Sequence, residues 1–215
     1  MKTLIIGLAT TLTLSIPGQT LAQDYSPKTK GTVIVAGRLT EVAPDASGQV
    51  RTAAGAATGL SVDVKSDVMP TLGLTYFLTD HIAVEAILGT TKHEILAKGA
   101  DGSTAVHETW VLPPVITAQY HFAPGARVSP YIGAGLNAMV FYGGKDKNGF
   151  QVKVDNGIGY AVQVGADVVL SGPWSANLDI KKVFFKTNAS INGGALKSKV
   201  TLDPLVASIG IARRF

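Results

Sequence analysis

Hydrophobic and polar residues alternate with a period of two along most of the chain, a pattern typical of β-strands with two unlike faces. Helical periodicity is absent. The expected strands are 32–43, 68–78, 82–91, 110–122, 128–141, 157–170, 174–186 and 200–215. Because an even number of antiparallel strands can close on itself, the pattern predicts an all-β fold, an eight-stranded antiparallel transmembrane β-barrel.

The segments between these strands alternate in length. Long polar segments are expected at 44–67, 92–109, 142–156 and 187–199, and short turns at 79–81, 123–127 and 171–173. The short segments contain Gly, Pro and Asp, which favour turns. Membrane barrels have long loops outside the cell and brief turns on the periplasmic side, and this alternation predicts that arrangement.

The two faces of the predicted strands differ in polarity. We assign the apolar face to lipid and the polar face to the barrel interior. The candidates that line this lumen are Arg38, Thr75, Glu85, Gln119, Asn137, Gln163, Asp167 and Asp179. Since buried ionised groups need partners, the charged members form either a plug that fills the barrel or a gate. A soluble lipocalin-like barrel, with the apolar face inward, is the alternative that parity alone leaves open.

Aromatic residues gather near both ends of the predicted strands, and two interfacial girdles are expected. One contains Tyr76, Phe77, Tyr120, Phe122, Tyr131, Trp174 and Phe215, and the other Trp110, Phe141, Tyr142, Phe184 and Phe185. Lys182 and Arg213 oppose the lipid assignment, but each lies near a strand end, where a charge can reach the interface.

The first residues predict export. Lys2 precedes an apolar run from Leu4 to Ile16, followed by small and polar residues up to Ala22, the pattern of a secretory signal peptide at 1–22. The barrel domain is then 23–215, in the outer membrane of a Gram-negative cell. The chain has no cysteine, and therefore no disulfide framework.

Composition and motifs argue against other classes of function. The formal net charge is +4, and the charges are scattered without a basic stripe, so a nucleic acid is not an expected partner. The four histidines lack zinc-site spacing, and no Gly-x-Ser-x-Gly motif appears. Ser103 and His107 share a segment, a weak signal for catalysis. No enzymatic activity, metal or cofactor is therefore expected.

Several segments resemble the OmpW family of eight-stranded outer-membrane proteins. They are 70–77, 83–85, 112–114, 119–122, 130–137, 165–167, 179–182, 203–204 and 209–215. The most specific are Leu112-Pro113-Pro114 and Pro130–Asn137, and the likeness is weak before Pro70. The resemblance implies that the terminal Phe215 is an assembly signal for the barrel-assembly machinery, although Arg213 stands where the family usually has an aromatic residue.

The resemblance implies that small hydrophobic molecules pass across the outer membrane. An eight-stranded barrel is wide enough only for side chains or one small ligand, which predicts a narrow channel. Release sideways into lipid needs an interruption of the wall, and Pro70, Pro113 and Pro114 are the candidates because proline lacks the ladder donor. Alternatively, these prolines only end a strand or shape its rim. The preferred interpretation is therefore a monomeric barrel that passes small apolar compounds. The runner-up function is a filled barrel that acts as a surface-exposed structural or interaction protein.

Overall fold

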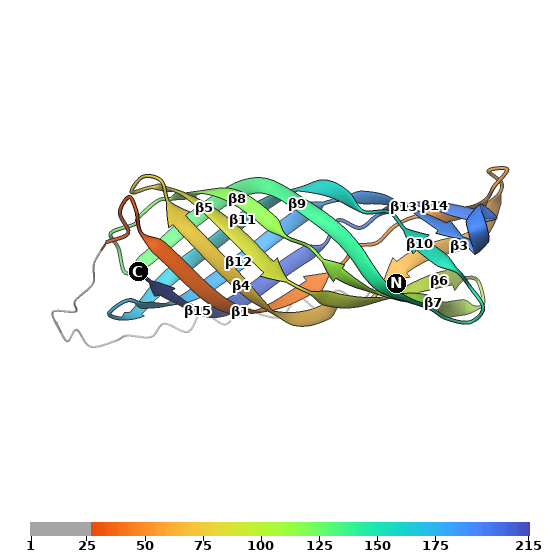
Figure 1. Cartoon of the computed structure of the whole chain (residues 1–215), viewed down its shortest axis with the longest axis horizontal. Helices are drawn as coiled ribbons and strands as arrows, with labels where there is room; N and C mark the ends of the chain where they lie inside the picture. The colour runs from red at the N-terminus through yellow and green to blue at the C-terminus, as the bar shows by residue number, and fades with distance from the viewer. Residues whose placement is uncertain (1–26) are drawn as a thin grey trace.

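Eight antiparallel strands close into one elongated barrel (Figure 1). The computed structural model describes residues 27–215, so the predicted signal peptide lies outside the described residues. The barrel strands are β1 (Val33–Ala43), β4 (Asp67–Phe77), β5 (Ile82–Gly89), β8 (Val115–His121), β9 (Val128–Asp146), β11 (Gly157–Ser171), β12 (Trp174–Phe184) and β15 (Leu205–Arg214). Each pairs with the next, and β15 pairs with β1 to complete the ring. The predicted eight-stranded barrel is confirmed.

The three predicted short turns connect β4 to β5, β8 to β9 and β11 to β12 at one end of the barrel, beside the C-terminus (Figure 1). We call this the turn end. The tightest connection is Gly172–Pro173, where Gly172 has a φ of 51°. A left-handed backbone of this kind favours glycine, since it has no Cβ. Within residues 27–215 no helix is both long and apolar enough to cross a bilayer.

The four long segments are not loops, and this part of the prediction was wrong. They contain β2 (Gln49–Thr52), β3 (Ala57–Val64), β6 (Thr91–Gly99), β7 (Gly102–Leu112), β10 (Val152–Val154), β13 (Lys186–Ile191) and β14 (Leu196–Thr201), with a short 3-10 turn at Asn192–Gly194. Together with the end of β9 they form an upper sheet that continues the barrel wall (Figure 1). Their polar residues lie at alternate positions and face outward, so the segments read as loops although their inward positions are apolar.

One predicted strand is divided. The range 110–122 contains the end of β7 and all of β8, which are separated by Pro113 and Pro114. Both strands pair with β9, so the wall continues on that side. The division follows from the missing proline N–H groups, which cannot join a ladder.

Large apolar side chains cover the outside of the barrel between its two ends. Examples with half or more of their surface exposed are Leu39, Leu72, Leu74, Leu88, Ile116, Ile132, Leu136, Val164, Ile180 and Ile209. A soluble monomer rarely exposes an apolar surface of this extent. The assignment of the apolar face to lipid is confirmed, and the lipocalin-like alternative is overturned.

Exposed aromatic residues form a ring near each end of this apolar belt. Tyr76, Tyr120, Phe122, Trp174 and Phe215 lie toward the turn end, and Trp110, Tyr142, Tyr160 and Phe184 toward the upper sheet. The girdle prediction was wrong for Phe77, Tyr131 and Phe185, which are buried inside the barrel, and for Phe141, which packs against the core and lines an interior cavity. Phe77, Phe141 and Phe185 each adjoin an exposed aromatic residue in the sequence. Because successive residues of a strand face opposite sides, only one of each pair can face lipid.

Lys182 and Arg213, the two charged residues that opposed the lipid assignment, have local partners on the outer face. The guanidinium of Arg213 lies 5.5 Å from the ring centroid of Trp174 and 4.8 Å from that of Phe215. Lys182 donates a hydrogen bond to the Asp203 carbonyl. Such contacts allow a cation to remain at a membrane interface.

Close packing between β15 and β1 requires a glycine at Gly210. A Cβ placed there would lie 2.1 Å from the carbonyl oxygen of Gly37 and 2.7 Å from the Cα of Arg38. We therefore expect Gly210→Ala to lower the free energy of unfolding by about 1–3 kcal/mol, the usual cost of overpacking. Urea titration of the protein in lipid vesicles measures the change. Gly37→Ala is the matched control, since a Cβ there meets nothing within 4 Å, and equal losses in both variants would contradict the packing explanation.

Candidate functional site

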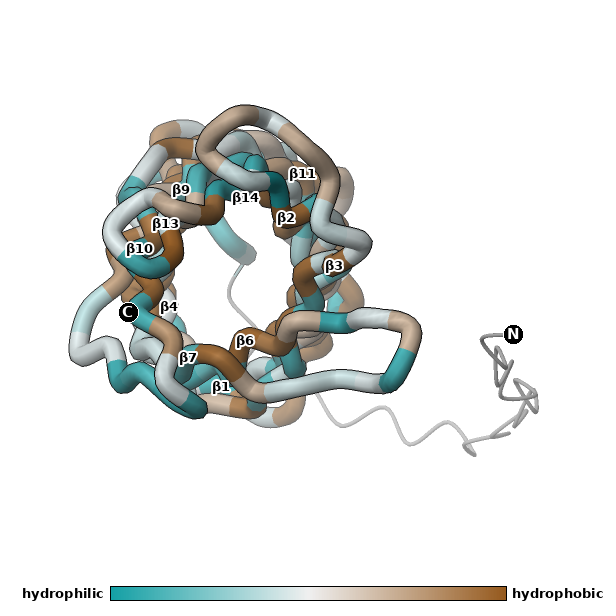
Figure 2. The backbone as a smooth tube through the Cα atoms, turned by 90° about the vertical axis from the view of Figure 1, so that its right-hand side faces the viewer, coloured by the Kyte–Doolittle hydropathy of each residue, from teal (hydrophilic) through white to brown (hydrophobic). Residues whose placement is uncertain are grey.

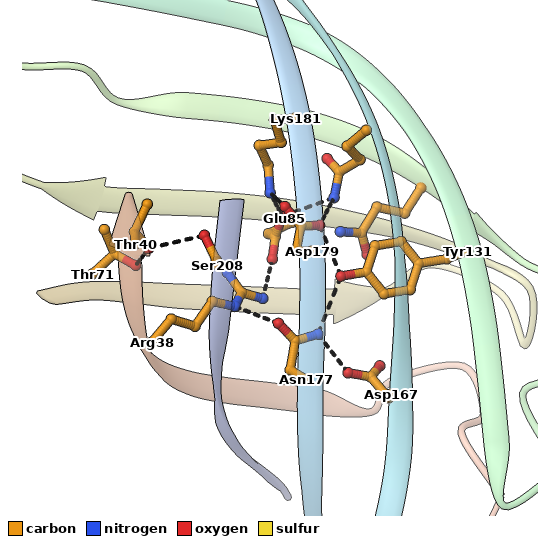
Figure 3. Close-up of polar contacts among 12 residues, drawn as sticks. Arg38, Thr40, Thr71, Glu85, Tyr131, Asp167, Asn177, Asp179, Lys181 and Ser208 are labelled. Atoms are coloured by element: carbon orange, nitrogen blue, oxygen red, sulfur yellow. Dashed lines mark hydrogen bonds and ion pairs between the residues drawn. The ribbon is translucent and has the colours of Figure 1, made fainter. Parts of the chain in front are cut away.

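A cluster of buried charges fills the lower barrel, and Glu85 lies near its centre (Figure 3). The Glu85 carboxylate accepts a hydrogen bond from Arg38 Nη2 at 2.6 Å and lies 3.3 Å from Lys181 Nζ. Gln163 Nε2 donates to its second oxygen at 3.2 Å. These residues come from four strands, β1, β5, β11 and β12, because the inward positions of all four meet at one height in the barrel.

A second carboxylate, Asp179, continues the cluster (Figure 3). It accepts hydrogen bonds from the Tyr131 hydroxyl at 2.9 Å and from Gln163 Nε2 at 3.0 Å, and it pairs with Lys181. Asn177 joins the parts: its amide oxygen accepts from Arg38 Nε at 2.6 Å, and its nitrogen donates to Asp167 at 2.7 Å.

The turn end of the barrel is closed by the segment before β1. Lys28 Nζ donates to Asp167 at 2.6 Å and lies 3.3 Å from His121 Nδ1. Its side chain is 5% exposed. The backbone N–H of Lys28 also donates to the Pro124 carbonyl at 3.1 Å, which fixes the segment across the opening.

The eight lumen candidates from the sequence are all buried in the barrel. Arg38, Glu85, Gln163, Asp167 and Asp179 share one hydrogen-bonded network. Gln119 is bonded to His121 at 3.1 Å, and Asn137 donates to the Pro114 carbonyl at 3.1 Å. Thr75 is buried nearby without a described side-chain hydrogen bond.

Sequence reasoning missed four members of the network. They are Lys28, Tyr131, Asn177 and Lys181. Asn177 and Lys181 lie two residues before and after Asp179. Because residues two apart in a strand face the same side, the alternation of the strand could have identified both. Lys28 precedes the first predicted strand, and no periodicity covers it. We call the whole network the polar plug.

Above the polar plug, apolar side chains form a layer that separates it from the upper sheet. The layer consists of Val111, Val115, Met139, Ala161, Val183 and Phe185. Its upper members, Val111 and Met139, also line a cavity of about 80 Å³ inside the upper sheet. We call this space the apolar cavity.

The wall of the apolar cavity consists almost wholly of apolar side chains. Among the 27 lining residues, only Thr91, His93, Thr109 and Thr187 are polar. Figure 2, which looks along the barrel, shows hydrophobic positions on β3, β6 and β13 around the ring. The apolar wall includes Leu60, Val62, Ile95, Phe150, Ala189 and Ile191. Such a lining suits a small apolar solute and excludes an ion.

The hydrogen-bonded ladder of the wall is interrupted beside the floor of the apolar cavity. On one side of this break β5 runs into β6, and on the other side β7 runs into β8. Ladder pairing stops at Ile87↔Val115 and resumes at Thr91↔Val111. Because the register is the same on both sides of the break, Gly89 lies opposite Pro113 and Leu88 opposite Pro114. Three unpaired positions on each strand span roughly 10 Å.

The prolines at this break differ in orientation. The carbonyl of Pro114 accepts from the Ala138 N–H, so the backbone of Pro114 faces β9. In an antiparallel strand the next residue faces the other way, and Pro113 therefore faces the break. Pro113 also lines the apolar cavity. Pro70 lies on the neighbouring strand β4, one residue before the Thr71↔Gly89 pair that ends the β4–β5 ladder.

A second seam lies higher, between β9 and β10. β9 pairs with β11 only as far as Met139↔Gly157, while β10 pairs with β13. Two side chains bridge this seam: Asn156 Oδ1 accepts from the Phe141 N–H at 2.8 Å, and Asp146 Oδ1 accepts from the Val152 N–H at 3.0 Å.

Ion pairs hold the outer surface of the upper sheet together. Lys147 Nζ lies 2.7 Å from Glu94 and 3.2 Å from Glu108, and Lys65 and Lys92 each pair with one of these carboxylates. Hydrogen bonds from Lys147 and Lys65 lower the pKa of Glu94 to about 2. Both carboxylates are therefore charged at neutral pH, which keeps the outer face of the sheet polar.

No three His, Cys, Asp or Glu side chains of residues 27–215 gather where they could hold a metal ion. His107 Nδ1 is bonded to Asp146 at 2.8 Å, and Ser103 lies opposite Lys98 in the β6–β7 hairpin.

An eight-stranded antiparallel barrel with an apolar outer belt, two aromatic rings and a filled interior is a small outer-membrane β-barrel protein. The OmpW family model matches residues 29–215. The uncharacterised outer-membrane protein y4mB of Sinorhizobium fredii is 40% identical over 161 residues, 73% of this chain and 70% of that protein. The chain therefore belongs to the OmpW family.

Two further comparisons agree. The dibenzothiophene metabolism operon protein PahQ of Pseudomonas aeruginosa is 33% identical over 182 residues, 82% of this chain and 85% of PahQ. The crystal structure of the outer membrane protein OprG from Pseudomonas aeruginosa has a TM-score of 0.83 at 27% identity, covering 88% of this chain and 98% of OprG. The protein is thus located in the outer membrane, with the turn end periplasmic and the upper sheet outside the cell.

Removing one charge from the polar plug tests whether the plug only fills the barrel or acts as a gate. In Glu85→Gln, Arg38 and Lys181 lose a shared counter-charge, so we expect a loss of about 3 kcal/mol in the free energy of unfolding. Urea titration measures it, with exposed Glu41→Gln as control. Planar-bilayer recordings should show no sustained current, since the other plug bonds remain. A stable ion current in Glu85→Gln would instead make the cluster a gate.

Proposed function

We propose that this protein admits small hydrophobic molecules from outside the cell into the apolar cavity and releases them sideways into the outer membrane. The observation that carries this proposal is the position of an apolar cavity directly above a polar plug. Below the cavity lie the apolar layer and then the buried charges of the polar plug. An apolar molecule gains nothing by displacing ion pairs. The remaining exits are through the wall.

The break at Pro113 is the exit we favour. It lies at the floor of the apolar cavity, and its outer side is flanked by exposed apolar residues such as Leu88 and Ile116. Opening the wall elsewhere in the barrel would rupture ladder hydrogen bonds, each worth about 1 kcal/mol. Opening it here ruptures none of the described ladder pairs. Pro70, which lies beside the same break, is proposed as part of it.

The relatives are consistent with an apolar solute. PahQ is named for a dibenzothiophene metabolism operon, and dibenzothiophene is a small apolar aromatic compound. The runner-up proposal is a filled barrel whose upper sheet serves as a contact surface. Proteoliposomes separate the two, since a filled barrel accelerates neither apolar nor polar probes, whereas the favoured function accelerates an apolar dye alone.

Substitution of Pro113 tests the exit. Pro113→Val restores a backbone donor toward the break, and one extra ladder bond of about 1 kcal/mol should slow uptake of an apolar dye by roughly fivefold. The measurement is dye fluorescence in proteoliposomes. Pro114→Val is the matched control, because its restored N–H faces β9 and leaves the break unchanged. Equal rates in wild type and Pro113→Val would count against this exit.

A reversible crosslink offers a stricter test, since the chain has no cysteine of its own. Leu88→Cys with Pro114→Cys places two thiols opposite each other across the break, at a pair whose backbones do not bond and where Cα atoms lie about 4.5 Å apart. We expect dye uptake to stop when the disulfide is oxidised and to return on reduction. If the oxidised protein takes up dye at the wild-type rate, the exit lies elsewhere, and the β9–β10 seam is the next candidate.

A further inference from the structure

Cationic side chains are unevenly paired over the outer surface of the upper sheet. On β3, β6 and β7 both lysines, Lys92 and Lys98, form ion pairs with carboxylates, and Lys65 and Lys147 beside these strands are paired as well. The neighbouring strands β10, β13, β14 and β2, which Figure 2 shows side by side on the ring, contain no Asp or Glu. Their exposed cations, none of which has an ion-pair partner within residues 27–215, are Arg51, Lys153, Lys186, Lys197 and Lys199.

Three of these cations lie in one row across the four strands. Lys197 on β14 is directly opposite Arg51 on β2. Its other neighbour is Ser190 on β13, which is opposite Lys153 on β10. Since adjacent strands lie about 4.8 Å apart, Lys197 is one strand spacing from Arg51 and two from Lys153. Like charges directly opposite each other are destabilising, and an anion bound across the row would remove that repulsion.

The row lies in a groove on the outer surface. One hollow is lined by Arg51, Lys197 and Lys199, and a second by Lys153 and Lys197. Both hollows also contain Ser190, so they adjoin. The groove therefore combines several cations with a neutral hydroxyl group, as suits a phosphorylated sugar.

Two carboxylates border the groove and leave it positive. Asp146 lines one hollow, but its Oδ1 accepts hydrogen bonds from His107 Nδ1 and from the Val152 N–H. Asp155 follows β10 in the chain, and its N–H donates to the Asn188 carbonyl. Five cations and two carboxylates give this region a net charge of +3.

The basic region begins directly above the membrane interface. Lys186 follows Phe184, a member of the upper aromatic ring, by two residues, and both side chains are exposed. At about 3.3 Å per residue, Lys186 lies about 7 Å and Ser190 about 20 Å from Phe184 along the chain. The outer leaflet of an outer membrane contains a glycolipid, lipopolysaccharide, whose sugars carry phosphate groups at this level. Basic clusters beside a membrane bind such anionic head groups.

We propose that β10, β13, β14 and β2 form a binding site for lipopolysaccharide, in which Arg51, Lys197 and Lys153 bind phosphate groups of its sugar head. A membrane glycolipid fits this groove better than a soluble anion, because the acyl chains of the same molecule can lie against the exposed apolar residues of β12 and β15 below, such as Ile180 and Leu205.

The site does not depend on the proposed solute route. In the order of strands around the upper sheet, β13 and β14 are farthest from β6 and β7, and they lie across the ring from them in Figure 2. The break at Pro113 is on the β6–β7 side. A glycolipid bound at the basic groove would therefore leave that break open.

Native mass spectrometry of the protein in detergent micelles measures the binding. Four probes are titrated: lipopolysaccharide that ends at the inner core, the same glycolipid after enzymatic dephosphorylation, phosphatidylglycerol, and inositol hexakisphosphate. We expect the phosphorylated glycolipid to bind most tightly. Equal binding of the dephosphorylated form or of phosphatidylglycerol would overturn the proposal, as would tighter binding of the soluble inositol hexakisphosphate.

Two triple variants that lose the same charge locate the site. We expect the Kd for lipopolysaccharide to rise about tenfold to hundredfold when the row is neutralised, since each cation near the surface contributes. The control variant should stay within about twofold of wild type. The row variant is Arg51→Gln with Lys153→Gln and Lys197→Gln, and the control is Lys65→Gln with Lys92→Gln and Lys98→Gln. An equal rise in both would reduce the effect to net charge and refute the site.

Hydrogen–deuterium exchange on the unaltered protein gives an independent location. Lipopolysaccharide should protect the backbone N–H groups of 49–52 and 186–201, because bound sugars cover these strands. The β6–β7 hairpin, 91–112, should exchange at an unchanged rate. Protection confined to that hairpin, or absent from both regions at saturating glycolipid, would show that the groove is not the site.

Discussion

Burial of charge inside a narrow barrel is the constraint on which the other features of this protein depend. Eight strands leave an interior that side chains can fill, and the inward positions of β1, β5 and β12 bring Arg38, Glu85 and Lys181 together there. Each ion would be costly alone, so the groups stay in place only as a complete set. Two lysines and an arginine face three carboxylates, Glu85, Asp167 and Asp179, and balance their charge. The lower barrel is therefore a fixed polar core, and any solute route has to begin above it.

The second organising feature is a reversal of polarity along each strand pair as it leaves the membrane. In β12 the inward residues Asn177 and Asp179 are polar and the outward residues Leu178 and Ile180 are apolar. In β13 the inward residues are Ala189 and Ile191, and the outward ones are lysine, asparagine and serine. Lipid requires an apolar exterior and water a polar one, so the interior takes the opposite character at each level. The apolar cavity follows directly from this reversal.

That reversal also explains what the sequence could and could not predict. The alternation along the membrane strands assigned the apolar face to lipid and all eight lumen candidates to positions that are buried in the barrel. This alternation follows because lipid and the barrel interior impose unlike polarity on the two faces of each strand. The upper sheet was missed since residues such as Lys186, Asn188 and Ser190 suggest a polar loop when read without regard to parity. The alternation of Thr187, Ala189 and Ile191 was the available signal. Lys28 could not be found, because its position depends on a segment that folds across the barrel mouth and has no repeat. The partners of Glu85 likewise depend on strand stagger, which fixes which inward residues share a height.

The apolar lining of the cavity defines what it can accept. Entry removes water from the solute, and an ionised group would lose far more there than the apolar wall returns. A polar group of a solute loses its water partners there and meets a wall of apolar side chains. An apolar ring or chain loses nothing and gains contact with the wall. The same molecules that fit the cavity are those that partition into lipid, so a break in the wall at Pro113 would let them leave along a path that becomes no more polar at any step. On the proposed function, the polar plug would let the outer membrane admit apolar molecules without a continuous aqueous path for ions.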